Sequence, residues 1–449
     1  MKVHTIILAA GSGSRMRSTK AKSLQKIAGQ TMLERIIKTA QKVSNKISIV
    51  VGFDKDGIID VASKLGNFNF VEQKNPKGTG HAVMQTIPYI SDDENVLVLY
   101  GDVPLIKEAT LKKLINNGSY EFSLLTSHPN NPKGYGRIIK NKEGNVVQII
   151  EEKDANEKER LIDEVFTGNL CIKGGLLKNT ISKIKNDNAA NEYYLTDLIK
   201  INSEDGIKIN ASSTDIEEVL GANSKIELEL LEDINRKMKA KDLQEQGVTI
   251  VDSKRLDIRG NTKAGSDCHI DVNVILEGEI ILGDGVEIGP NVYIKDSKIG
   301  NNTQIKAFSF IEDAEIGNNC SLGPYARIRE GSEILDEAKI GNFVETKKSI
   351  IGKGSKANHF SYLGDSTIGD NTNIGAGAIT CNYDGKNKNK TTIGDNSFIG
   401  TNSSLVAPVT IGSGSYVAAG SVITKDVPDN TLGISRSKQE NKRKPLNKK

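Results

Sequence analysis

The sequence contains no tryptophan and only four cysteines, although it has 449 residues. The cysteines lie far apart, at Cys171, Cys268, Cys320 and Cys381, and form no C-x-x-C pair, so neither a disulfide framework nor a zinc site is indicated. No segment approaches the roughly 18 consecutive apolar residues of a membrane span, and the N-terminus shows no charged-then-apolar leader. We therefore expect a cytoplasmic protein without membrane insertion.

An excess of charge of either sign is also missing. The 60 lysines and arginines nearly balance 57 acidic residues, which leaves a formal net charge of +3. Such a small surplus on a long chain gives no case for nucleic-acid binding. The length predicts two or three domains. Glycine, by contrast, is plentiful at 43 residues, and its concentration in the second half of the chain indicates a second architecture there.

Apolar and amphipathic segments alternate over the first half of the chain. Apolar runs at 4–9, 46–52, 68–72 and 95–102 predict strands. Amphipathic segments at 32–43, 80–90 and 111–117 predict helices. This alternation favours a mostly parallel α/β sheet covered on both faces.

A long helix is predicted over 224–247. Apolar residues recur at every fourth position along it: Ile226, Leu230, Ile234 and Met238. Ser224 and Glu227 form an S-x-x-E capping box at its start, and Gly247 suits its end. We expect a linker helix between two domains.

The chain after this helix is a hexapeptide repeat. One apolar residue recurs every six positions: Ile288, Ile294, Ile305, Ile311, Leu322, Ile328, Ile334, Ile340, then Ile393, Ile399, Leu405, Ile411, Val417 and Ile423. Such a period predicts a parallel β-helix, in which each unit buries its apolar residue by stacking on the next. Shortened steps of five residues end at Ile299, Ile316, Ile351 and Ile368. Their recurrence predicts three hexads per coil, hence a triangular prism.

A polar insertion interrupts the repeat, and a basic tail follows it. The insertion "CNYDGKNKNK", at 381–390, must leave the prism as a loop, either as a binding element or as a tolerated surface insertion. The tail at 435–449 is basic and without periodicity, which is typical of a solvated, disordered segment. The predicted domains are therefore 1–223, a linker helix at 224–247, a β-helix at 248–434 and the tail.

The segment "LAAGSGSRM", at 8–16, follows the first predicted strand. Gly11 and Gly13 are not followed by the third glycine of a dinucleotide-binding turn, and the sequence is not a P-loop. Backbone N–H groups together with Arg15 and Lys22 can hold a triphosphate. A simple tight turn explains the two glycines equally well.

A second candidate is Asp102, in "VLVLYGDVPL". It follows a buried strand, and ligands of open α/β sheets sit beyond the carboxyl ends of the strands. A carboxylate there suits Mg²⁺, which takes a few protein oxygens together with phosphates. A turn-forming aspartate after Gly101 is the alternative.

Taken together, "LAAGSGSRM", "KGTGHAV", "YGDVPL", "GYGRI" and "EEKDA" resemble the sugar-nucleotide pyrophosphorylase domain. Joined to a prism that contains "KANHFSYLGDSTIGDNTNIGAGAITCNYDG", they resemble the family of bacterial bifunctional N-acetylglucosamine-1-phosphate uridylyltransferase / glucosamine-1-phosphate acetyltransferase enzymes. The resemblance covers about residues 3–436. It implies a Rossmann-like mixed-sheet nucleotidyltransferase domain, a linker helix and a left-handed parallel β-helix.

The resemblance implies a UTP site in the first domain. Positions that bind UTP and the UDP-sugar correspond to Leu8, Ala9, Ala10, Gly11, Lys22, Gln73, Gly78, Thr79, Tyr100, Gly101, Asp102, Gly136, Glu151, Tyr194 and Asn223. Among them, Leu8–Gly11, Gln73, Gly78 and Thr79 correspond to uridine contacts, and Tyr100, Gly136, Glu151 and Tyr194 to contacts of the N-acetylglucosamine phosphate. Asp102 and Asn223 correspond to the Mg²⁺ ligands. Arg15 and Lys22 correspond to catalytic cations on the triphosphate. A sugar-phosphate oxygen would attack the α-phosphate of UTP and release pyrophosphate, a reaction that needs positioning and charge neutralisation.

Two residues depart from the family pattern. Ala21 replaces a proline, which we expect to matter little. Phe166, in "EVFTGNL", replaces an asparagine that contacts the sugar, and a lost hydrogen bond in a buried site costs roughly 1–3 kcal/mol. We therefore expect altered sugar affinity or selectivity, unless Asn169 compensates.

The resemblance also implies an acetyltransferase site in the prism. His359 corresponds to the general base. Glucosamine-phosphate-binding positions correspond to Arg329, Lys347, Tyr362 and Asn373. Acetyl-CoA-binding positions correspond to Ala376, Asn382, Tyr383, Thr401, Ala419 and Arg436, with the N–H of Ala376 as the oxyanion donor and Arg436 as an anchor for the coenzyme phosphates.

The implied function is a pair of reactions. Acetyl-CoA and glucosamine 1-phosphate give N-acetylglucosamine 1-phosphate, and UTP then gives UDP-N-acetylglucosamine for peptidoglycan and lipopolysaccharide synthesis. The resemblance further implies a homotrimer with acetyltransfer sites shared between chains. Two alternatives stay open: a single-function sugar-1-phosphate nucleotidylyltransferase with a structural prism, and a non-catalytic trimeric scaffold.

Overall fold

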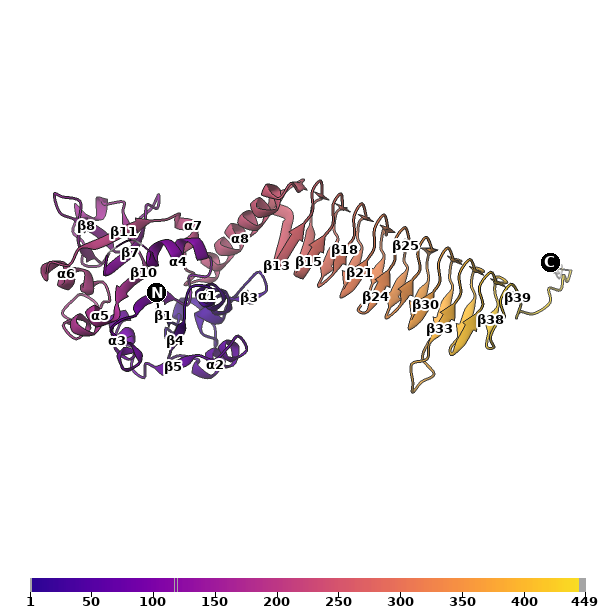
Figure 1. Ribbon diagram of the computed structural model, residues 1–449, viewed down its shortest axis with the longest axis horizontal. Coiled ribbons are helices and arrows are strands. Elements are labelled where there is room, and N and C mark those ends of the chain that lie inside the picture. The colour runs from indigo at the N-terminus through magenta and orange to yellow at the C-terminus, as the bar shows by residue number, and fades with distance from the viewer. Residues whose placement is uncertain (1, 117, 119, 444–449) are drawn as a thin grey trace, which may run out of the picture. The chain divides into compact units, whose positions relative to one another are not determined.

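The computed structural model describes residues 2–116, 118 and 120–443. The chain divides into two compact units, one ending at Asn235 and the other beginning at Arg236 (Figure 1). Each unit is described by itself below. Across the described ranges, no helix combines the length and the apolar character needed to cross a bilayer.

A mixed nine-stranded sheet forms the centre of the first unit. Its main path has the order β11-β7-β10-β6-β1-β4-β5, with the hairpin β8-β9 attached to β10. Along that path every pair is parallel except the two made by β10. The strands are β1 (Val3–Leu8), β4 (Lys46–Val51), β5 (Asn69–Glu72), β6 (Asn95–Tyr100), β7 (Phe122–Ser127), β8 (Arg137–Lys140), β9 (Val146–Ile150), β10 (Val165–Lys173) and β11 (Ile209–Ser213).

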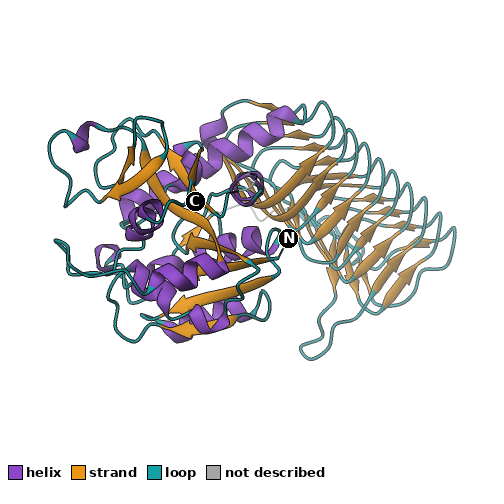
Figure 2. Ribbon diagram, turned by 60° about the vertical axis from the view of Figure 1, so that its left-hand side comes forward, coloured by secondary structure: helices purple, strands orange, loops and turns teal. Residues whose placement is uncertain are grey.

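Helices cover both faces of this sheet (Figure 2). Because side chains alternate along a strand, Ile7 of β1 enters the core on one face and Ile6 enters the core on the other. The helices are α1 (Met32–Gln41), α2 (Lys55–Ser63), α3 (Thr79–Met84), α4 (Glu108–Ile115), α5 (Gly174–Ile181), α6 (Asp197–Glu204) and α7 (Ile216–Val219). A small hairpin, β2 (Lys26–Ile27) and β3 (Gln30–Thr31), precedes α1.

Two predicted helices have different bounds in the structure. The helix predicted over 80–90 is wrong in its second half, since α3 ends at Met84 and only a 3₁₀ turn follows at Ile87–Tyr89. Pro88 lacks an N–H group, and the hydroxyl of Thr86 bonds the carbonyl of Val83, so the α-helix stops. The helix predicted over 111–117 begins earlier, at Glu108; residue 117 lies outside the described residues.

Helix α8 (Lys225–Glu245) runs through the division between the two units. Its predicted apolar stripe is confirmed at Ile234, which is buried, and wrong in the first turns, where Ile226 is 81% exposed and Leu230 50% exposed. There Leu231 is the buried residue instead. A strict four-residue spacing drifts around a helix of 3.6 residues per turn, so the stripe does not stay on one face. The cap is also half-formed, because the Glu227 carboxylate accepts from the N–H of Asn223 rather than from Ser224.

The second unit is the predicted parallel β-helix, with three faces per coil (Figure 2). One face contains β12 (Thr249–Ile250), β14 (His269–Ile270), β16 (Glu287–Ile288), β19 (Gln304–Ile305), β22 (Ser321–Leu322), β25 (Lys339–Asn342), β28 (Lys356–His359), β31 (Asn373–Ile374), β34 (Phe398–Ile399), β37 (Tyr416–Val417) and β39 (Leu432–Gly433).

The other two faces share one sheet, because β13 (Leu256–Ala264) and β15 (Val274–Leu282) span both. The second face continues with β17 (Tyr293–Lys295), β20 (Phe310–Glu312), β23 (Arg327–Ile328), β26 (Glu345–Lys347), β29 (Tyr362–Gly364), β32 (Ile379–Cys381), β35 (Ser404–Val406) and β38 (Val422–Ile423). The third contains β18 (Lys298–Ile299), β21 (Ala314–Ile316), β24 (Ser332–Ile334), β27 (Ile350–Ile351), β30 (Ser366–Ile368), β33 (Thr391–Ile393) and β36 (Val409–Ile411).

The hexapeptide ladder forms the core of the prism. Every apolar residue predicted on the ladder is buried in one continuous cluster. The five-residue steps are tight corners, where residues such as Asp296 and Asp313 adopt positive φ angles of 42° and 46°. The segment between β32 and β33 leaves the same corner and projects from the coils in Figure 1, as the insertion predicts.

Candidate active sites

The glycine turn after β1 lies at the carboxyl end of the sheet. The N–H of Gly101 donates to the carbonyl of Leu8 at 3.0 Å, which holds the turn beside the end of β6. Gly13 has a φ of 60°, and a Cβ there would lie 2.7 Å from Cβ of Lys22. The second glycine is therefore needed for the close approach of Lys22, in addition to any phosphate contact.

Lys22 brings two distant segments together. It begins a 3₁₀ turn at Lys22–Leu24, and its ammonium forms an ion pair with the largely buried carboxylate of Asp102, which follows β6. The same ammonium donates to Oδ1 of Asn223 at 3.1 Å. Asn223 is held in turn by Glu227, whose carboxylate accepts from the Asn223 N–H at 2.5 Å.

The donor set around this ammonium suits a hard divalent cation. Asp102 and Asn223 each present an oxygen to one positively charged group, and Mg²⁺ takes oxygen ligands from one or two protein side chains and completes its shell with water and phosphate. Within the described residues, no group of three or more His, Cys, Asp or Glu side chains forms a metal cluster. A site with only two protein ligands therefore needs the phosphates of a bound nucleotide.

A pocket of about 240 Å³ opens beside these residues. It is lined by Leu8, Ala10, Gly11, Lys22, Gln73, Pro76, Gly78, Thr79, Ala82, Tyr100, Asp102 and Glu192. Nine of these residues are predicted site residues, whereas Ala9 and Gly101 are buried and do not line the pocket. Pro76, Ala82 and Glu192 were not predicted; the proximity of Glu192 to Tyr194 in "NEYYLTD" is the signal that could have found it.

Another wall of the pocket contains Gly78, a second glycine in a close backbone contact. Gly78 has a φ of 106°, and a Cβ there would lie 2.6 Å from the carbonyl oxygen of Tyr193. The side-chain amide of Gln73 donates to the carbonyl of Gly78 at 3.1 Å, and Thr79 Oγ1 accepts from the N–H of Leu195. These bonds fix the loop on which the predicted uridine contacts lie.

The remaining predicted sugar-phosphate contacts surround Glu151. A Cβ on Gly136 would lie 3.5 Å from Oε2 of Glu151, so the two residues are side by side. Thr196 donates to Oε1 of Glu151 at 2.9 Å. Burial raises the pKa of Glu151 above its ordinary value. Burial, and then the charges of Asp154 and Glu151, raise the pKa of Tyr194 to about 12, so its hydroxyl keeps its proton near neutral pH.

Arg15 is not drawn into this cluster. It lies exposed on the 3₁₀ turn Ser14–Met16 and forms no hydrogen bond or ion pair with any residue that the structure describes. Of the two predicted catalytic cations, the fold places only Lys22 against Asp102.

Phe166 packs into the apolar core of the first unit. It is 6% exposed, and the pairing of β10 with β7 is irregular between Phe166 and Leu170. Asn169 is fully buried in this bulge, where its amide nitrogen donates to the carbonyl and hydroxyl of Thr167. Within the described chain its Oδ1 has no hydrogen-bond partner. The compensation by Asn169 stays a prediction.

The second cluster follows one edge of the prism. Five residues on successive coils stand directly before a corner residue of positive φ: Asn342, His359, Ala376, Thr401 and Ala419. The corner N–H groups link the column, since Gly377 donates to His359, Asn402 to Ala376 and Gly420 to Thr401. The stacking of coils thus aligns the predicted base, the predicted oxyanion donor and two predicted acetyl-CoA contacts.

His359 is exposed at this edge and contacts only one side chain of its column. Its Nδ1 lies 3.2 Å from Oδ1 of Asn342 on the preceding coil. An amide oxygen only accepts hydrogen bonds, so Nδ1 carries the hydrogen and Nε2 presents its lone pair to solvent. The N–H of Ala376, one coil further, bonds no acceptor among the residues described.

The predicted phosphate-binding cations lie on the adjacent face. Arg329 follows β23 and bonds Glu345 at 2.8 Å, and Lys347 of β26 bonds Glu330 at 2.8 Å. Tyr362 of β29 pairs with Glu345 across the ladder. Both cations are about three-quarters buried and already neutralised by acids, so a phosphate must exchange with or join these carboxylates.

The inserted loop is anchored on this face. Asn382 is buried, and its amide donates to the carboxylate of Asp365 and to the hydroxyl of Tyr362. Tyr383 is 57% exposed, with the Lys388 ammonium 4.8 Å from its ring centroid. Arg436 donates to the carbonyl of Ala419 at 2.7 Å, which joins two predicted acetyl-CoA contacts. Asn373 begins β31 on the first face.

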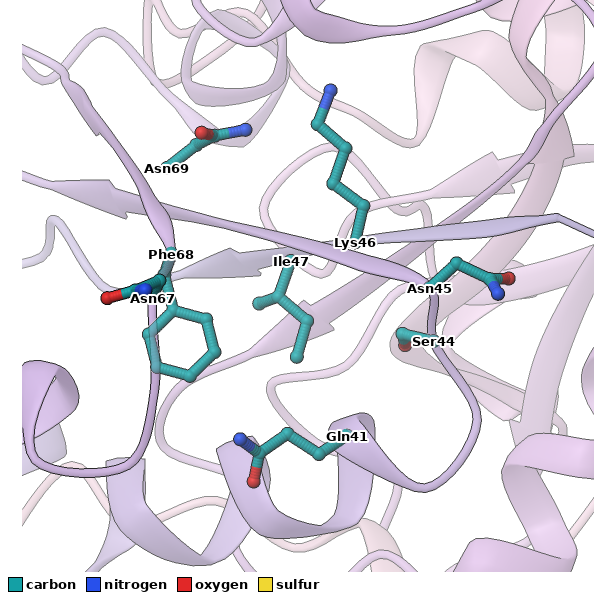
Figure 3. Close-up of a pocket in the computed structure, with 8 residues that line it drawn as sticks. All are labelled: Gln41, Ser44, Asn45, Lys46, Ile47, Asn67, Phe68 and Asn69. Carbon is teal, nitrogen blue, oxygen red and sulfur yellow. The ribbon is translucent and has the colours of Figure 1, made fainter.

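A further pocket, of about 290 Å³, contains none of the predicted residues (Figure 3). It is lined by Gln41, Ser44, Asn45, Lys46, Ile47, Asn67, Phe68 and Asn69. Because Lys46 and Asn69 begin β4 and β5, this pocket lies at the amino edge of the parallel strands. Ligands of such sheets bind at the carboxyl edge, where the Lys22 cluster lies.

Comparisons with known proteins give matches in both units. Residues 5–135 match the MobA-like NTP transferase domain, residues 258–335 the GMPPB C-terminal domain, and residues 390–425 the bacterial transferase hexapeptide (six repeats). Curated relatives match over nearly their whole length. "Bifunctional protein GlmU" of Acinetobacter baumannii (strain ACICU) is 47% identical over 98% of both chains, and that of Cellvibrio japonicus is 48% identical over 97% of both.

The protein is therefore a transferase in which a nucleotidyltransferase domain is joined to a hexapeptide-repeat β-helix, and the predicted fold class is confirmed. The match over nearly the full length of these relatives identifies the family. The chain belongs to the GlmU family of bifunctional enzymes, as the resemblance predicts.

Proposed function

We propose that the chain acetylates glucosamine 1-phosphate with acetyl-CoA and then transfers a uridylyl group from UTP to the product, giving UDP-N-acetylglucosamine and pyrophosphate. The observation that carries the proposal is the edge column His359–Ala376–Thr401–Ala419. Coil stacking would align any residues at this corner, so the support lies in their identity: an exposed histidine whose ring is oriented by Asn342, followed on the next coil by the N–H of Ala376 without an acceptor among the described residues. The first unit supplies a separate nucleotide pocket.

Uridylyl transfer rests on the positioning of two anions. The pocket between Gly11 and Thr79 holds UTP, while Gly136 and Glu151 hold the sugar phosphate, so that its oxygen attacks the α-phosphorus in line with the departing pyrophosphate. The ammonium of Lys22 leaves Asp102 and Asn223 to neutralise the phosphates. Arg15, exposed and unpaired with the described residues, is available for the same role.

Asp102 and Asn223 would hold Mg²⁺ through one carboxylate and one amide oxygen. When bound there, the ion supplies positive charge to the triphosphate. Lys22 must move aside for it, because the ammonium contacts both oxygens in the structure.

Acetyl transfer follows from the geometry of the edge column. The amine nitrogen of glucosamine 1-phosphate attacks the thioester carbonyl, and Nε2 of His359 takes a proton from that amine. The N–H of Ala376 faces the developing oxyanion. The carbon–sulfur bond then breaks, and the proton held by His359 passes to the departing thiolate to give free coenzyme A. Arg329 and Lys347 hold the sugar phosphate; Tyr362 and Asn373 hold the sugar. Asn382, Tyr383, Thr401, Ala419 and Arg436 hold the coenzyme.

Three further features belong to the same proposal. The protein acts as a homotrimer with acetyltransfer sites shared between chains, and it acts in the cytoplasm. Its functional domains are 1–223 and 248–434, joined by the linker at 224–247, with residues 444–449 of the basic tail outside the described residues.

The test is a coupled product assay on the full chain with glucosamine 1-phosphate, acetyl-CoA, UTP and Mg²⁺. Free coenzyme A and pyrophosphate are followed separately. Release of both, with formation of UDP-N-acetylglucosamine, supports the proposal. Pyrophosphate released from supplied N-acetylglucosamine 1-phosphate, without any acetylation of glucosamine 1-phosphate, favours the single-function alternative. Coenzyme A without pyrophosphate places the defect in the first unit.

A further inference from the structure

A single buried guanidinium joins the two backbone segments that form the sugar-phosphate end of the first site. Arg137, at the start of β8, is only 2% exposed. Its Nη2 contacts the Glu152 carboxylate at 2.7 Å, and its Nη1 donates to the carbonyl oxygen of Tyr135. Glu152 also accepts from the N–H of Gly134 at 3.1 Å.

These contacts flank the two residues assigned to the sugar phosphate. Gly136 lies between Tyr135 and Arg137, while Glu151 directly precedes Glu152. The backbone of Arg137 pairs with Ile150 on one side and with Val165 on the other. The guanidinium thus fixes the chain beside Gly136 and beside Glu151, the two residues of this contact.

Stability alone does not explain an arginine at this place. Its Nε is buried and has no partner among the residues that the structure describes, and a buried donor without a partner is destabilising. An apolar residue in β8 would avoid this penalty. The two bonds to Tyr135 and Glu152 are what arginine adds, because its planar fork donates in two fixed directions.

We propose that Arg137 is a positioning residue for the sugar-phosphate end of the uridylyltransferase site, which holds Gly136 and Glu151 in register by bridging the Tyr135 carbonyl and the Glu152 carboxylate. The inference rests on the proposed function, since it concerns the binding of N-acetylglucosamine 1-phosphate. It adds a residue that does not touch the sugar but decides where its two contacts lie.

The test compares Arg137→Lys with Arg160→Ala in the full chain. Lysine keeps a positive charge for Glu152 but lacks the second, fixed donor for Tyr135. Arg160 also faces Glu152, at 4.0 Å, but from an exposed position and without contact to Tyr135. We expect Arg137→Lys to raise the KM for N-acetylglucosamine 1-phosphate about tenfold, with the KM for UTP and the acetylation rate unchanged. Arg160→Ala should leave all three unchanged.

The KM split distinguishes positioning from a merely structural role. A folded Arg137→Lys enzyme with an unchanged sugar-phosphate KM, or with equal losses toward UTP and the sugar phosphate, overturns the inference. If Arg137→Lys does not fold, Glu152→Gln decides, because it weakens the same bridge from the other side; a raised sugar-phosphate KM supports the inference and an unchanged one refutes it. A wild-type chain that forms no UDP-N-acetylglucosamine refutes the proposed function instead.

Discussion

Lys22 and Asn223 lie 201 residues apart in the chain, yet the ammonium of Lys22 donates to the amide oxygen of Asn223 at 3.1 Å. The same ammonium contacts Asp102, so three segments meet at one charge. The lysine thus neutralises the carboxylate. Under the proposed function, Mg²⁺ would have to replace this ammonium at Asp102, so one cation would be exchanged for another.

Asp102→Ala should separate the two activities. Loss of the carboxylate removes an oxygen ligand at the phosphates and leaves Lys22 without its ion pair. We expect pyrophosphate release to fall by about 10²-fold or more, the usual effect of deleting one electrostatic contact in a transition state. Release of coenzyme A should stay at the wild-type rate, because the edge column of the prism is untouched. Equal losses of both products from a folded chain would contradict two independent sites.

His359→Ala should have the reverse effect. His359 is the only histidine in the edge column. Loss of a general base reduces rates by about 10²–10⁴-fold. Asn342→Ala should have a smaller effect on acetylation, about tenfold, because it removes the acceptor that fixes the Nδ1–H tautomer. Both variants should retain uridylyl transfer from supplied N-acetylglucosamine 1-phosphate. Normal acetylation by His359→Ala would remove the histidine from the mechanism.

The prism could be predicted from the sequence because its core depends on one residue in six. Ile311 and Ile328 are buried for the same reason that the period exists: each stacks on its equivalent one coil away. The alignment of Ala376 with Thr401 was harder to foresee. The inserted loop between them lengthens that coil, so the sequence spacing hides their equivalence and only the ladder of backbone bonds restores it.

In the first site, only residues that stand in a recognisable motif could be predicted. Lys22 and Asp102 each stand in a recognisable segment, but their contact depends on a tertiary arrangement that no local pattern specifies. Arg137 escaped prediction for a related reason, since one of its partners is the backbone carbonyl of Tyr135, which is invisible in a sequence. The exposed side of α8 was mispredicted because Ile226 continues a spacing that the helix does not keep on one face.

Ile340→Ala tests the energetics of the prism. Ile340 is fully buried on β25, and removal of its side chain should lower the free energy of unfolding by about 2–5 kcal/mol. Because each coil contacts only its neighbours, hydrogen exchange should accelerate most in the coils that contain Leu322 and Ala357. Lys339→Ala, at the exposed neighbouring position, should change stability by less than about 0.5 kcal/mol. Uniform acceleration across the whole prism would show instead that it unfolds as one unit.

A buried histidine should make the first unit less stable in mild acid. His4 is fully buried, with Nδ1 3.0 Å from Glu94 and Nε2 2.8 Å from Ser48, and Lys46 adds a repelling charge. Burial outweighs the Glu94 contact and lowers the pKa of His4 below its ordinary value of 6.5. The unfolded chain therefore binds a proton more readily than the folded one.

The sign follows from this difference in proton binding. The stability that His4 contributes is complete above pH 6.5 and decreases as the pH falls from 6.5 toward the lowered folded pKa of His4. Between pH 7.5 and 5.5 the unfolding temperature of the first unit should fall more in the wild type than in His4→Gln. His128→Gln is the matched control, because that side chain is 49% exposed, and it should keep the wild-type profile. A His4→Gln chain with the same pH dependence as the wild type would show that another group causes the acid sensitivity.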